Sequence, residues 1–241
     1  MKIIVQKNSK YTLSEFFNQV IYLDYIEGIV LNVFKTSDNV LIVLNLTSHD
    51  EALFKTIYSN QFVNSKGLEM VPLQEVISYL NRINYKKKVL LNIIFYQPIQ
   101  LTEEQNKLLV KEYNEYVSNL NKILSNNSLI LYIHSVSRTL INYLKKGNIK
   151  AKLGFAVVGF DLTYIDVDYY VFTVDMLNFP LLKQQLENNK EIMIYISSDY
   201  ELSYMYDILK GVKKTDLTKE IGKELYLIGD YPELLNKTFL E

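Results

Sequence analysis

Short runs of apolar residues recur along the chain, and stretches with the spacing of amphipathic helices separate most of them. The runs are continuously apolar rather than alternating, which is typical of strands buried on both faces in a parallel sheet. They are IIV (3–5), GIVLNVF (28–34), VLIVLNL (40–46), VLLNIIFY (89–96), LILYIHS (129–135), KLGFAVV (152–158), YYVFTV (169–174), IMIYIS (192–197) and LYLIGD (225–230). The pattern therefore predicts nine strands with crossover helices between most of them.

The clearest of these helices is predicted over residues 101–124. Thr102 and Gln105 have the spacing of a capping box, in which each side chain bonds the backbone amide of the other residue. Apolar residues then recur at helical spacing and predict one buried stripe, made of Leu109, Tyr113, Tyr116, Val117, Leu120 and Leu124. Further helices are predicted within residues 11–20, 72–80, 137–146 and 178–187.

Only residues 35–39 join the second run to the third. A parallel crossover takes about a dozen residues, so these two runs should form an antiparallel hairpin with a turn near Asp38 and Asn39. Without the hairpin strand, eight β units remain, which is the count of a (β/α)8 barrel. We therefore predict an α/β protein, a TIM barrel with an antiparallel hairpin after the second strand, formed by one domain over residues 1–241. A doubly wound open sheet is the alternative.

Composition narrows the class of protein further. A formal net charge of −1 argues against a nucleic-acid partner, which would select for a basic face. The chain has no cysteine. Its only arginines are Arg82 and Arg138, so side chains that can form bidentate hydrogen bonds with phosphate are scarce. The lysines of YKKK (85–88) are interpreted as a solvated face, with contact to an anionic partner as the alternative. No apolar run reaches the roughly 18 residues of a membrane span, and we expect a cytoplasmic protein.

Seven segments carry a more specific pattern. They are GIVLNVFKTSD (28–38), HDEALFKT (49–56), VPLQEVISYL (71–80), LLNIIFY (90–96), IHSVS (133–137), IMIYISSD (192–199) and LIGDYPELL (227–235). In this order they resemble motifs of the glycerophosphodiester phosphodiesterase family, among them G-x-x-E-L-D-V-x-x-T-x-D, H-D-x-x-L-x-R-T and L-N-I-E-I-K. The resemblance implies a TIM barrel. It also implies a hydrolase of lipid metabolism that cleaves glycerophosphodiesters with a divalent cation such as Mg²⁺ or Ca²⁺.

The positions that match the family's chemistry hold other residues here. The H-R-G motif, with a catalytic histidine and a phosphate-binding arginine, corresponds to residues 6–8, where Lys7 replaces the arginine. The two metal carboxylates of E-L-D correspond to Val30 and Asn32. The other replacements are Ile94 for a metal glutamate, Tyr96 for a phosphate-binding lysine and Tyr195 for the pocket tryptophan. Hard cations need oxygen ligands, so the resemblance predicts that the metal chemistry is lost.

His49 and Asp50 are the vestigial catalytic candidates. If the hairpin has the same length as in the family, the family's H-D motif aligns with Asn45 and Leu46. If this chain has four extra residues there, the motif aligns with His49 and Asp50. Both registers stay open. Asp50 also suits the N-cap of a following helix, because a carboxylate accepts the unpaired amide hydrogens there. This structural role is the preferred one.

The remaining candidates lie at or near strand ends. His134 and Asp230 end apolar runs and are ligand-binding candidates together with Lys7, Asn32 and Tyr195. Their structural alternatives are a hydrogen-bonded core histidine at His134 and a cap of the closing turn at Asp230. No metal site and no cofactor are expected.

We therefore predict a catalytically inactive relative with a binding or regulatory role. Its partner would be a small phosphorylated ligand or an active paralogue, with homo-oligomers left open. One alternative is an active metal-dependent phosphoric diester hydrolase with a rearranged site. The other is a structural barrel within an oligomer.

Overall fold

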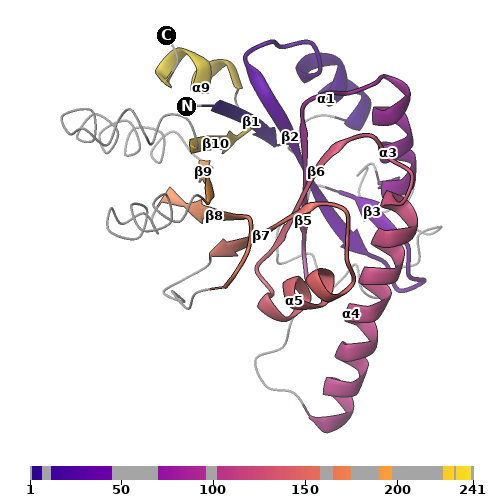
Figure 1. The fold of residues 1–241 in the computed structure, drawn as a ribbon. Coiled ribbons are helices and arrows are strands. Elements are labelled where there is room, and N and C mark those ends of the chain that lie inside the picture. The colour runs from indigo at the N-terminus through magenta and orange to yellow at the C-terminus, as the bar shows by residue number, and fades with distance from the viewer. Residues whose placement is uncertain are drawn as a thin grey trace.

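Eight parallel strands close into a barrel in the computed structural model, which describes residues 2–6, 12–44, 70–95, 102–157, 165–174, 190–196, 225–230 and 232–239 (Figure 1). The strands are β1 (Lys2–Gln6), β2 (Ile26–Lys35), β5 (Lys88–Ile93), β6 (Ile130–Ser135), β7 (Lys152–Val157), β8 (Tyr169–Thr173), β9 (Glu191–Ile196) and β10 (Leu225–Gly229). Because β1 pairs with both β2 and β10, the sheet is a closed TIM barrel, as predicted, and the open doubly wound alternative is wrong.

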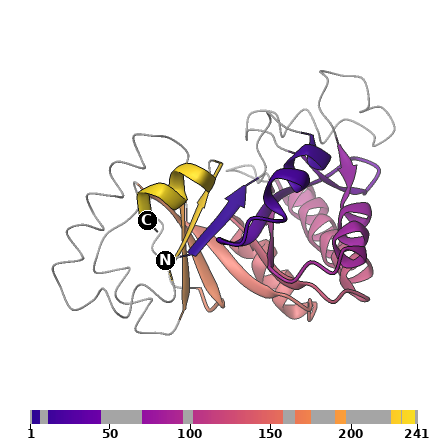
Figure 2. The same cartoon turned by 90° about the horizontal axis from the view of Figure 1, so that it is seen from above.

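Helices cover the outer face of this barrel. They are α1 (Leu13–Val20), α3 (Leu73–Arg82), α4 (Glu103–Leu124), α5 (Arg138–Lys146) and α9 (Pro232–Phe239), the last lying beside β1 and β10 (Figures 1 and 2). The predicted capping box at Thr102 and Gln105 is present. The predicted stripe of α4 is buried except for Val117, which is partly buried and packs against the same core. None of the described helices is long and apolar enough to span a membrane.

The predicted antiparallel hairpin follows β2. Strand β3 (Leu41–Val43) pairs with the end of β2, and Asn39 makes the turn with a positive φ of 66°. The Thr36 hydroxyl donates to the Asp38 carboxylate at 2.6 Å and so helps to fix the turn. A two-residue strand, β4 (Val71–Pro72), extends this arm beyond β3. The apolar pattern did not predict β4, because so short a strand has no periodicity of its own.

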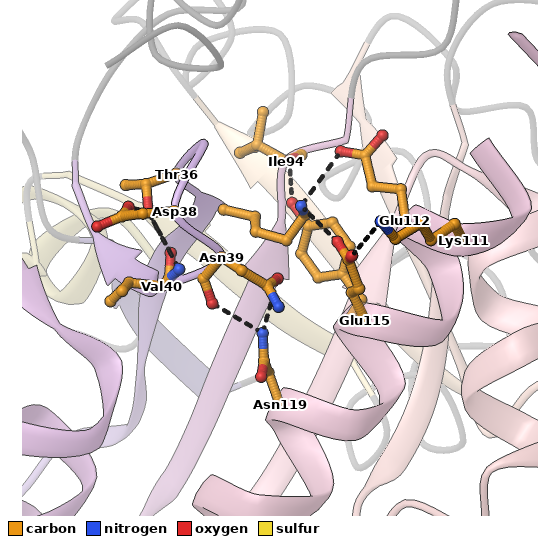
Figure 3. Close-up of polar contacts among 11 residues, drawn as sticks. Thr36, Asp38, Asn39, Val40, Ile94, Lys111, Glu112, Glu115 and Asn119 are labelled. Atoms are coloured by element: carbon orange, nitrogen blue, oxygen red, sulfur yellow. Dashed lines mark hydrogen bonds and ion pairs between the residues drawn. The ribbon is translucent and has the colours of Figure 1, made fainter. Parts of the chain in front are cut away.

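Helix α4 is attached to the hairpin by polar contacts (Figure 3). The Lys35 ammonium lies 3.1 Å from a Glu115 oxygen and 4.0 Å from a Glu112 oxygen, and its side chain is only 10% exposed. The Asn119 amide donates to the Asn39 carbonyl at 2.9 Å (Figure 3). These contacts fix the hairpin against α4 at the end of β2.

The lumen of the barrel is filled with side chains. Alternate residues of seven of the strands point inward and form an apolar cluster, against which Ala156 of β7 packs. The cluster consists of Ile4, Val30, Leu90, Tyr132, Tyr169, Val171, Met193, Tyr226 and Ile228. Gly154 makes room for one of the three tyrosines among them: a Cβ at this glycine would lie 2.3 Å from Cζ of Tyr169. The Tyr169 ring therefore crosses the lumen in the space that a side chain at 154 would take. The outward-facing residues form the larger core beneath the helices.

Candidate functional site

A row of polar side chains crosses three neighbouring strands near the C-terminal end of the barrel. Asn32 of β2 is in register with Asn92 of β5, and Asn92 is in register with His134 of β6. Each lies two residues beyond a lumen residue of its own strand, so all three point into the barrel. Active sites of TIM barrels lie at this end of the strands. The Tyr169 hydroxyl is hydrogen-bonded to His134. We call these four residues the polar row: Asn32, Asn92, His134 and Tyr169.

The two asparagines are bonded to each other. The Asn92 amide nitrogen donates to the Asn32 carbonyl oxygen at 2.9 Å, and Asn32 is buried. Asn32 occupies a position where the family resemblance places a metal-binding carboxylate. An amide pair is uncharged and offers both donors and acceptors, so it suits hydroxyl and amide partners better than a bare cation.

His134 is a buried, neutral imidazole. It is 3% exposed, and its Nδ1 forms a 3.0 Å hydrogen bond with the Tyr169 hydroxyl. Burial lowers the pKa of His134 to about 3 and raises that of Tyr169 well above its ordinary value, so both groups are uncharged at neutral pH. A base with so low a pKa accepts a proton poorly near pH 7. The arrangement corresponds to the structural alternative for His134, a hydrogen-bonded core histidine.

Tyr195 and Asp230 lie on the opposite wall of the barrel. Tyr195 of β9 packs against the lumen cluster and is in register with Thr173 of β8 and Ile228 of β10. Asp230 directly follows β10, at the same end of the barrel as the polar row. The structure therefore brings Asn32 and His134 together through Asn92, and it places Tyr195 and Asp230 near the same end. Lys7, His49 and Asp50 lie outside the described residues, and so does either register of the H-D motif.

Residues at two matched metal positions do not fit a divalent cation. Val30 is buried in the lumen cluster, and Ile94 packs against the small apolar cluster of Phe34, Ile42 and Leu44. Asn32, at a third such position, already bonds Asn92. Among the described residues, no three His, Asp or Glu side chains are grouped so that they could hold a metal ion. Val30 and Ile94 therefore offer no side-chain oxygen, and Asn32 offers only a neutral amide, whereas a hard cation requires oxygen ligands.

Sequence reasoning missed Asn92 and Tyr169 as members of the polar row. Asn92 lies inside a motif that resembles the family, but only the strand register shows that it faces Asn32. Tyr169 is 35 positions from His134, and an apolar run gives no sign of this contact. The one available signal was Gly154, since a glycine inside a strand often marks a close approach by another group.

No family model and no curated protein matches this sequence. Solved structures do match it in fold. A phosphodiesterase from Oleispira antarctica, solved with its product sn-glycerol-3-phosphate, superposes with a TM-score of 0.69 at 12% identity, over 100% of this chain and 97% of that one. A glycerophosphodiester phosphodiesterase from Parabacteroides distasonis gives 0.65 at 12% identity, over 98% and 95%. The enzyme of the same name from Agrobacterium tumefaciens gives 0.55 at 14%, over 97% and 98%. The chain thus has the fold of the glycerophosphodiester phosphodiesterases, as the motifs predicted.

Proposed function

We propose that this barrel is a catalytically inactive relative of the phosphodiesterases that binds a small glycerol-like or phosphorylated ligand without a metal. The observation that carries the proposal is the polar row, which is uncharged and in which Asn32 stands where the resemblance places a metal carboxylate. Asn32 and Asn92 bond each other at 2.9 Å, and His134 and Tyr169 do so at 3.0 Å.

The chemistry of these groups argues against hydrolysis. Phosphoryl transfer needs charge compensation for the reacting phosphate, which a metal ion supplies in such enzymes and which is worth several kcal/mol. Val30 and Ile94 offer no oxygen, and the pKa of about 3 leaves His134 a poor general base. The partly exposed amide of Asn92 remains suited to binding, because amides exchange hydrogen bonds with hydroxyl groups, whereas His134 and Tyr169 are buried against each other.

The remaining candidates extend this site in the proposal. Tyr195 would contribute an aromatic surface where the resemblance has a tryptophan, and Lys7 would supply the cation for a phosphate group. Asp230 would accept a hydrogen bond from a ligand hydroxyl. His49 and Asp50 are left as remnants with no role in binding.

Thermal unfolding with added ligand tests the proposal. With sn-glycerol 3-phosphate or glycerol in EDTA, we expect the melting temperature to rise with ligand concentration, because a ligand bound only by the folded state stabilises it. At about 100 times Kd the stabilisation is about 2.7 kcal/mol, or several degrees for a chain of this length. Asn92→Ala should abolish the rise produced by glycerol, which carries no charge.

The matched control is Asn114→Ala, which removes an exposed amide that bonds only a carbonyl of its own helix among the contacts described. This variant should keep the full response. A response equal in Asn92→Ala and Asn114→Ala would remove the polar row from the binding site. A rise that needs Mg²⁺ or Ca²⁺ and disappears in His49→Ala would favour the rearranged, active hydrolase instead.

A further inference from the structure

A second group of polar residues lies at the opposite, N-terminal end of the barrel. Lys2, Lys88, Lys152 and Glu191 are the first residues of β1, β5, β7 and β9. Each precedes by two positions a residue that faces the lumen, so each side chain points into the N-terminal opening. The YKKK segment was interpreted as a solvated face, and for Lys88 this is wrong, because its side chain is 15% exposed.

Glu191 is the centre of this group. One of its oxygens lies 3.3 Å from the Lys88 ammonium. The other accepts a hydrogen bond from the Tyr132 hydroxyl at 3.1 Å and pairs with Lys152. Both carboxylate oxygens are therefore engaged by Lys88, Lys152 and Tyr132, without any contribution from Lys2.

The three ammonium groups surround two tyrosine rings. Lys2 and Lys88 lie 5.2 and 4.8 Å from the centre of the Tyr226 ring. Lys88 and Lys152 lie 4.2 and 5.3 Å from the centre of the Tyr132 ring. Lys2 also donates to the Tyr226 hydroxyl at 3.4 Å. The three cations are thus gathered around these two rings, with Lys88 close to both of them.

Among the described residues, positive charge exceeds negative charge at this end of the barrel. The three lysines face Glu191 and, next to Lys152, Asp168, whose carboxylate also accepts the Leu153 amide hydrogen at 2.7 Å. Burial lowers the pKa of Lys88, and although Glu191 opposes this shift, Lys152 and Lys2 add to it by repulsion. Glu191 pairs with Lys88 and Lys152, and these ion pairs alone would be enough to close this end of the barrel, so they give no reason for Lys2. An unbalanced cation in a low-dielectric opening attracts anions.

We propose that the N-terminal opening, formed by Lys2, Lys88, Lys152, Tyr132 and Tyr226 around Glu191, binds a multiply charged oxyanion of the phosphate class. The anion would bridge the lysine ammonium groups, since charged donors form short, strong bonds with phosphate oxygens. Glu191 holds two of the lysines in place and competes with the anion for them. Glu191 begins β9 at the N-terminal end of the barrel, whereas Asn32, Asn92 and His134 lie near the C-terminal ends of their strands. Tyr169 lies between the two groups, in register with Glu191 and with its ring centre 5.2 Å from that of Tyr132.

Calorimetric titration with inorganic phosphate and pyrophosphate at constant ionic strength tests this proposal. Lys2→Gln should weaken binding by about tenfold, the effect of losing one charge-assisted hydrogen bond. Lys150→Gln, the same charge change at an exposed position two residues before β7, should leave the affinity unchanged. Glu191→Gln should strengthen binding, because it removes the competing carboxylate.

Each arm has a result that overturns the proposal. Equal affinity in Lys2→Gln and the wild type, or no heat with either anion, would refute the site, as would weaker binding by a folded Glu191→Gln protein. If Glu191→Gln does not fold, the comparison of Lys2→Gln with Lys150→Gln decides alone. Asn92→Ala should leave phosphate binding intact, which separates this site from the proposed function.

Discussion

Lowering the pH should destabilise the barrel through His134. In the unfolded chain this imidazole titrates near its ordinary pKa of 6.5, whereas in the barrel burial lowers the pKa to about 3. Between these values the unfolded state binds a proton that the folded state does not bind, so the free energy of unfolding falls as the pH falls. One pKa unit corresponds to about 1.4 kcal/mol. The loss is therefore about 2 kcal/mol between pH 7.5 and pH 5, and about 3 kcal/mol by pH 4.

Urea denaturation at several pH values, for the wild type and for His134→Gln, measures this contribution. Glutamine does not titrate, and the carboxylates of the chain titrate in both proteins, so the difference between the two unfolding free energies isolates His134. We expect the variant to be less stable at pH 7.5, where it loses the contact with Tyr169, and to approach or exceed the wild type near pH 4. If the two stability curves run parallel between pH 7.5 and pH 4, the imidazole is not held neutral by burial and the reasoning fails.

Three further changes test the packing that positions the site. Gly154→Ala should cost about 2–4 kcal/mol in chemical denaturation, because its Cβ would overlap the Tyr169 ring and overpacked cores are strained; wild-type stability would show that the ring moves freely. Lys35→Ala should lower the free energy of unfolding by about 1–3 kcal/mol, since its mostly buried ammonium pairs with Glu115. Lys111→Ala removes an exposed partner of the same glutamate and should lower it by under about 0.5 kcal/mol. Equal losses would contradict this difference. Thr102→Ala should cost about 1 kcal/mol by removing the capping box of α4, and a melting curve unchanged from wild type would argue against that role.

Much of the fold follows from periodicity alone. All nine apolar runs overlap strands, because strands buried on both faces need continuous apolar sequence. The five-residue link between the second and third runs was enough to predict the hairpin, and Thr102 with the stripe from Leu109 to Leu124 was enough to predict α4.

The site was less predictable, because its contacts join strands that are distant in sequence. The resemblance drew attention to Asn32 and His134, but the bonds to Asn92 and Tyr169 depend on barrel register and on the space left at Gly154. The same limit explains Lys88. A lysine that begins a buried strand looks solvated in sequence, and only closure of the barrel places it over Tyr132 and Tyr226.

We infer that this barrel binds a small ligand without catalysing hydrolysis. Incubation of the full chain with glycerophosphocholine and either Mg²⁺ or Ca²⁺, with glycerol 3-phosphate release measured against an EDTA control, tests it most directly. We expect no release above the control with either metal. Metal-dependent release that scales with protein concentration and is lost in His49→Ala would contradict it.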